Sequence, residues 1–136
     1  MKSLPLGFLF FLLLFSHLLS AAESPASQVS FEENQGQWPS SVHYVSSTSQ
    51  YRAALTSDGL RLSPTHPTTV PEEIVLRWID SKARPEISAR TEMPYHSNYF
   101  VGNDPREWKT AVPFFGEVTY HGVYPGISVA YHAHGK

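Results

Sequence analysis

The residues best suited to chemistry are three histidines near the C-terminus of the 136-residue chain. His132 and His134 stand two positions apart, so a β-strand would place both side chains on one face. Together with His121 they supply three imidazole nitrogens, a common ligand set for zinc. The His-x-His pair also lies where chain ends fray, because it falls within the last five residues. We favour this second interpretation and expect no metal and no cofactor.

Acidic and serine residues give the next candidates, and neither set predicts a catalytic site. The two carboxylate pairs, Glu32–Glu33 and Glu72–Glu73, consist of adjacent residues, which point to opposite sides of an extended chain. We interpret them as solvated edges. No serine lies in a Gly-x-Ser-x-Gly elbow, and no glycine loop of the phosphate-binding type occurs. A hydrolase that uses Asp or Glu stays an alternative, but we predict that the protein is not an enzyme.

Aromatic residues are numerous, and they have two interpretations. Exposed rings would stack on sugars or on partner proteins, so a carbohydrate-binding module is the main alternative function. Buried rings would supply core mass in a chain that has no cysteine and therefore no disulfide, and we favour burial. The rings in question are Trp38, Tyr44, Tyr51, Trp78, Tyr95, Tyr99, Phe100, Trp108, Phe114, Phe115, Tyr120, Tyr124 and Tyr131.

The N-terminus predicts export. Met1-Lys2-Ser3 is a short positive start, an apolar Leu/Phe-rich run follows from Leu4 to Leu19, and Ser20-Ala21-Ala22 provides the small residues of a cleavage site. A membrane anchor is the alternative. We predict that residues 1–22 form a signal-peptide helix that is cleaved after Ala22, so that the protein is secreted or held at the cell surface. Periplasmic and extracellular destinations both stay open.

Charge and cysteine content narrow the partners. A formal net charge of −2 without a basic run does not indicate nucleic acid, and contact with a membrane is expected only through an uncleaved signal peptide. The absence of cysteine excludes thiolate chemistry and a lipid-modified cysteine after the signal. No Asn-x-Ser/Thr acceptor occurs, which fits a bacterial secreted protein.

The elements that would position these residues are short strands. After a small, polar, flexible lead at residues 23–28, strand-like runs are separated by turn residues, with the hairpin signal Ser57-Asp58-Gly59 between two of them. We therefore predict one all-β domain, an antiparallel β-sandwich-like fold, over residues 29–136. Its strands are expected at residues 42–45, 51–55, 60–62, 73–79, 86–89, 118–120 and 127–131.

Four local predictions refine this picture. Ile74, Leu76 and Trp78 alternate onto one face of a strand, with Trp78 in the core. Ser63 to Pro71 is a proline-rich loop, and His121 to Gly126 is a turn. Only one short helical turn is predicted, from Pro105 to Trp108, with Asp104 as its N-cap.

Two stretches resemble one known family. Phe31-Glu32-Glu33-Asn34-Gln35-Gly36-Gln37-Trp38 resembles the opening of the N-terminal domain of bacterial exported proteins that carry SBBP (seven-bladed β-propeller) repeats. The stretch Ser97 to Pro105, followed by Trp108 to Pro113, Val118-Thr119-Tyr120 and Val123 to Ile127, is similar to the same domain. The resemblance covers nearly the whole chain after residue 22.

The resemblance implies a module without an assigned function, followed in family members by another strand and then by the propeller repeats. We accordingly expect residues 29–136 to be truncated at the C-terminus. The resemblance also implies partners, which are the propeller repeats of a longer parent polypeptide, with cell-surface polysaccharide as the alternative. The predicted function is a non-enzymatic structural or interaction module of an exported bacterial protein.

The motif residues are those of turns and loops rather than of proton transfer. Glycines supply turns, asparagines bond to neighbouring backbone and prolines set loop entry. We therefore predict structural roles for Asn34, Gly36, Trp38, Asn98, Tyr99, Gly102, Asn103, Asp104, Trp108, Pro113, Tyr124, Pro125 and Gly126.

Overall fold

The computed structural model describes residues 29–66, 72–81 and 84–133, and within these ranges the protein is an all-β domain, as predicted. The predicted signal peptide at residues 1–22 and the predicted lead at residues 23–28 lie outside the described residues, as does His134. The strands are β1 (Phe31–Glu33), β2 (Val42–Ser47), β3 (Tyr51–Thr56), β4 (Gly59–Pro64), β5 (Ile74–Arg77), β6 (Glu86–Tyr99), β7 (Lys109–Tyr124) and β8 (Ile127–His132), and one helical turn, η2, spans Pro105–Glu107.

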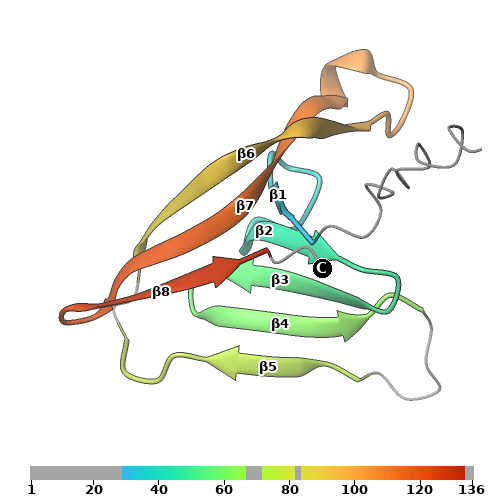
Figure 1. The fold of residues 1–136 in the computed structure, drawn as a ribbon. Helices are drawn as coiled ribbons and strands as arrows, with labels where there is room; N and C mark the ends of the chain where they lie inside the picture. The colour runs from blue at the N-terminus through green and yellow to red at the C-terminus, as the bar shows by residue number, and fades with distance from the viewer. Residues whose placement is uncertain (1–28, 67–71, 82–83, 134–136) are drawn as a thin grey trace, which may run out of the picture.

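All strands of the described residues join one antiparallel sheet in the order β5-β4-β3-β2-β1-β7-β6, with β8 also paired to β7. Strands β1 and β8 share one edge of β7: β1 pairs Phe114 and Phe115, and β8 pairs the part from Glu117 to Tyr124. The sheet curls, so that β7 and β8 cross over the flat stack of β2 to β5 (Figure 1). The two sides of the predicted sandwich are thus parts of one continuous sheet.

The main core fills the inside of this curl. Its buried residues are Phe31, Tyr44, Leu55, Val118, Tyr120 and Val123, and Trp78 packs against them. Trp78 meets Tyr120 edge-on, with ring centroids 4.8 Å apart. The predicted core position of Trp78 is therefore confirmed. Ile74 and Leu76 share its face but are each 58% exposed, because β5 is the last strand of the sheet.

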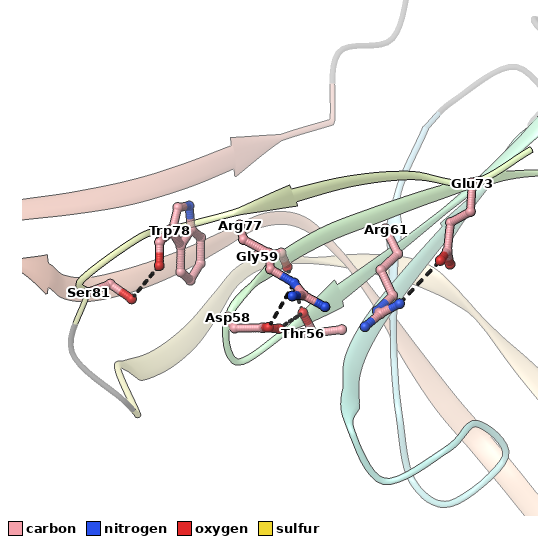
Figure 2. Close-up of polar contacts among 8 residues, drawn as sticks. All are labelled: Thr56, Asp58, Gly59, Arg61, Glu73, Arg77, Trp78 and Ser81. Atoms are coloured by element: carbon pink, nitrogen blue, oxygen red, sulfur yellow. Dashed lines mark hydrogen bonds and ion pairs between the residues drawn. The ribbon is translucent and has the colours of Figure 1, made fainter.

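The β3–β4 hairpin forms where Asp58-Gly59 predicts it (Figure 2). The buried Thr56 hydroxyl donates to Asp58 Oδ1 at 2.8 Å, which closes the turn. Gly59 has φ +149°, and a Cβ added there would lie 1.9 Å from the carbonyl oxygen of Leu76. Only glycine allows β5 to approach the hairpin so closely.

Strands β6 and β7 form a long twisted arm that ends at η2 (Figure 1). The pairing shifts between Glu92 and His96 and again between Ser97 and Tyr99, and such bulges increase the local twist. Thr91 has φ +59°, and its side chain lies close to Gly116, where a Cβ would come within 3.2 Å. Gly116 therefore leaves room for the bend of the arm.

The described elements confirm the predicted strands and correct several of their limits. Residues 121–124 belong to β7 rather than to a turn, because Gly122 at φ +62° makes a bulge and pairing resumes at Tyr124 opposite Ile127. Ser63 and Pro64 extend β4 rather than begin a loop, since they pair with β3 at the sheet margin. Thr65 and His66 follow as a bend, and residues 67–71 of the predicted loop lie outside the described residues. No helix in the described ranges is long and apolar enough to cross a membrane.

Candidate functional site

The two stretches that carry the family resemblance meet in space. Tyr99, at the end of β6, donates its hydroxyl hydrogen to Glu32 Oε1 in β1 at 2.5 Å, across 67 residues of sequence. The side-chain amide of Gln37 donates to the same oxygen at 3.0 Å. We call this region, formed by Glu32, residues 34–38 and residues 99–109, the motif junction. Its centre is a carboxylate on a residue only 7% exposed, held by a donor from each stretch.

Asn34 organises the loop that enters the junction. Its Nδ2 lies 3.2, 3.0 and 2.7 Å from the carbonyl oxygens of Trp38, Pro39 and Val42, and its Oδ1 accepts from the backbone N–H groups of Gly36 and Trp38. Three acceptors around the nitrogen and two donors around the oxygen fix the orientation of the amide. Gly36, at φ +106°, supplies the turn that this arrangement needs.

Further side chains pack beside the motif junction, against Trp38 and against Phe114, the pairing partner of Glu32. The guanidinium of Arg52 lies over the Trp38 ring, 4.9 Å from its centroid, and Tyr95 packs against Phe114 with centroids 5.3 Å apart. Burial first, and then the Glu32 carboxylate, raise the pKa of Tyr99 to about 12, against an opposing effect of Arg52. The Tyr99 hydroxyl therefore keeps its proton near neutral pH and can donate the hydrogen bond to Glu32.

The tip of the arm presents apolar side chains to solvent. Phe100 is 62% exposed and Val101 is 71% exposed. Trp108 packs against Phe100, with the two rings edge-on and their centroids 5.1 Å apart, and its Nε1 donates to the Gly102 carbonyl at 3.3 Å. Gly102, at φ +77°, turns the chain at this point.

Polar contacts hold the backbone of the arm in place. Asp104 Oδ1 accepts from the backbone N–H of Arg106, and the pair also forms a salt bridge of 2.6 Å. The predicted N-cap and the helical turn are therefore confirmed. Contact with Arg106 keeps the pKa of Asp104 below its usual value. Asn98 accepts from the N–H of Ala111, which has φ +56°, while Asn103 lies exposed between Gly102 and Asp104.

Two pockets flank the loop at Gly36. The smaller, of about 330 Å³, lies inside the motif junction and is lined by Gly36, Gln37, Tyr99, Val101, Glu107 and Lys109. Both family stretches thus contribute to its wall. The larger, of about 590 Å³, is lined by residues that include Trp38, Ser40, His43 and Tyr44. The sequence did not single out His43, whose Nε2 lies 2.7 Å from Ser57 Oγ and whose pKa is lowered by burial.

The carboxylates of the site lie apart, as the alternation of β1 requires. Glu32 faces Tyr99, whereas Glu33 shares the face of its pairing partner Tyr44 and borders the larger pocket. Burial and the charge of Glu33 raise the pKa of Tyr44. The two carboxylates therefore lie on opposite faces of β1 and do not form a pair.

The histidines that the sequence offered as weak metal-ligand candidates are not brought together in the described residues. His121 bonds Ser88 on β6 at 2.7 Å, and His132 contacts Glu117 across the β7–β8 pair at 3.5 Å. His132 therefore sits beside β7 four residues from His121, a separation of about 13 Å along the strand. His134 lies outside the described residues, and no group of three His, Asp or Glu side chains within the described ranges is arranged to hold a metal.

The remaining motif residues lie in β7 and in the turn that follows it, where they contribute to the fold. Tyr124 donates its hydroxyl hydrogen to the carbonyl of Ile79 at 2.8 Å, which ties β7 to the segment after β5. Pro125 and Gly126, the latter at φ +73°, make the β7–β8 turn. Pro113 lies in β7 opposite His96, immediately before the residues that pair with β1.

The sugar-binding alternative requires coplanar exposed rings. Among the aromatic residues of the described ranges, Tyr51 and Phe100 are exposed. Phe100 lies at 85° to its neighbour Trp108, and the other ring pairs are tilted or edge-on as well. These rings do not make a flat stacking platform.

Comparison with known proteins shows that one family model matches this chain. The model of a domain of unknown function, DUF7948, matches residues 31–136, from the first strand onward and across both motif stretches. No curated protein and no solved structure matches the chain.

Proposed function

Because the chain belongs to the DUF7948 family of domains of unknown function, we propose a role for it as a non-enzymatic interaction module of an exported bacterial protein. The partner is the set of SBBP propeller repeats of the parent polypeptide. The observation that carries the proposal is the pocket in the motif junction, whose walls come from both family stretches.

The chemistry of the junction favours binding over catalysis. The polar atoms of Asn34 and the Tyr99 hydroxyl are used within the domain, where they hold the loop against the arm. What the junction offers to the outside is the pocket and the exposed side chains of Phe100 and Val101 beside it. Exposed apolar side chains next to a concave surface are typical of a protein contact.

A binding measurement with a matched control tests the surface. The processed chain, from Glu23 onward, is titrated with an SBBP-repeat propeller from a DUF7948 protein in a calorimeter. Val101→Asp should weaken binding at least about tenfold, since a charge would be buried in an apolar contact. Ile127→Asp places the same charge on an exposed aliphatic residue in the β7–β8 hairpin, and it should bind like the native chain.

The outcomes separate the parts of the proposal. Absence of binding by the native chain would reject the propeller as partner. Equal binding by both variants would reject the junction as the surface. Export is tested independently by mass spectrometry of the periplasmic and cell-free fractions, in one of which the protein should be found with Glu23 as its N-terminal residue.

A further inference from the structure

Strand β5 forms an open edge at the opposite end of the strand order from the arm. Its pairing partner in the described residues is β4, and all four of its residues are exposed. Ile74 and Leu76 are each 58% exposed and Val75 is 39% exposed. An apolar edge of this kind is a template for pairing with another strand.

The direction of the free backbone groups follows from one hydrogen bond. The N–H of Trp78 donates to the Asp58 carbonyl at 3.0 Å, in register with the β4–β5 pairs. In an antiparallel pair, alternate residues bond to the same neighbour, so Ile74 and Leu76 bond toward β4. The backbone N–H and C=O groups of Glu73, Val75 and Arg77 therefore point away from the sheet.

We infer that β5 pairs with β5 of a second copy of this chain, antiparallel, about a two-fold axis at Val75. Val75 then lies opposite its own copy, Ile74 opposite Leu76, and Glu73 opposite Arg77. The outward groups of Glu73, Val75 and Arg77 fall in register for about six hydrogen bonds between the strands. A two-fold contact of this kind joins the same patch on both copies.

The charges of Glu73 and Arg77 favour this register of the β5–β5 pair, and they favour a second copy of the chain as the partner. An axis two residues earlier would put Glu73 opposite Glu73, and an axis two residues later would put Arg77 opposite Arg77. Like charges directly opposite each other destabilise a strand pair, whereas opposite charges stabilise it. The strand is thus complementary to itself in the register that its free backbone groups allow.

Salt bridges from the β3–β4 hairpin fix the charged side chains that the pairing between two copies of β5 would use. Arg61 bonds Glu73 at 3.2 Å, and Arg77 lies 3.6 Å from Asp58, so both charged side chains are held on the same face of the sheet (Figure 2). The opposite face carries Ile74 and Leu76, which would extend the apolar face of the sheet from one copy into the next. The surface lies apart from the motif junction, so the inference does not rest on the proposed function.

A pair of charge variants tests the inference on the processed chain. Glu73→Arg and Arg77→Glu each place like charges opposite one another in the self-pair, so each should weaken dimerisation at least about tenfold. An equal mixture of the two variants places every Arg opposite a Glu, and it should form a heterodimer. Analytical ultracentrifugation measures all four samples, and circular dichroism confirms that each is folded.

A backbone variant separates edge pairing from any other dimer. Val75→Pro removes an N–H that points outward and leaves the bonds to β4 in place, which an edge strand tolerates. It should be folded and monomeric. A native chain that is monomeric at high micromolar concentration overturns the inference, as does a dimer that persists in Val75→Pro or a mixture of the charge variants that stays monomeric.

Discussion

Replacing Tyr99 by phenylalanine removes the hydroxyl that joins the two family stretches and leaves the ring in place. Glu32 is 7% exposed, and it loses a donor at 2.5 Å while it keeps Gln37 at 3.0 Å. A hydrogen bond to a charged group contributes about 1.5–3 kcal/mol, and the remaining amide offsets part of the loss. We expect the free energy of unfolding to fall by about 1–3 kcal/mol.

Urea unfolding followed by tryptophan fluorescence measures this change. Tyr51→Phe, on a residue that is 49% exposed, is the control and should change stability by less than about 0.5 kcal/mol. Glu32→Gln and the double variant complete a cycle, in which the coupling between the two side chains should be about 1 kcal/mol or more. If Tyr99→Phe is as stable as Tyr51→Phe, or if the coupling is zero, the contact does not hold the junction together.

Three further outcomes follow from the described contacts. Gly59→Ala should destabilise the domain by about 2–6 kcal/mol in urea unfolding, because strain at φ +149° adds to a clash with the Leu76 carbonyl; a stable variant would contradict the tight approach of β5. Asn34→Asp should cost at least as much stability as Asn34→Ala, since it turns a carboxylate toward three carbonyl oxygens, and equal melting of Asn34→Asp and the native chain would refute this. Alkali should destabilise the domain. Burial raises the pKa of Tyr99 to about 12 and that of Tyr120 further, so stability is complete below about pH 10 and falls as the pH rises through 12, by roughly 1 kcal/mol for the partly exposed Tyr99. Unfolding curves that coincide at pH 9 and pH 12 would contradict the last expectation.

Local pattern was enough to predict most strands but not their lengths. Alternation of apolar residues and the Asp58-Gly59 turn are local signals, and both were confirmed. The lengths of β6 and β7 could not be predicted, because Pro94 and Pro113 suggest that the strands are interrupted there. In the structure Pro94 lies where the pairing register shifts, on a strand whose outer edge pairs with no other described strand, and proline is tolerated there.

The junction itself could not be predicted from local pattern. β1 has only three residues and carries two glutamates, so it has little of the composition of a strand. Its burial comes from contacts with β7 and with Tyr99, which lie far away in sequence. The resemblance marked the residues on both sides of the junction, but the hydrogen bond between them depends on the curl of the sheet.

The two proposed surfaces lie at opposite ends of the strand order, and this placement has a consequence for binding. A pair joined through β5 leaves both motif junctions free, so it carries two sites for propeller repeats. Two linked sites bind an array of partners more tightly than a single partner, by effective concentration alone. Glu73→Arg should therefore weaken retention on a surface densely coated with propellers by about tenfold or more, while its affinity for one soluble propeller stays native. Val101→Asp should weaken both. If Glu73→Arg is retained on the dense surface as strongly as the native chain, pairing through β5 makes no contribution to binding there.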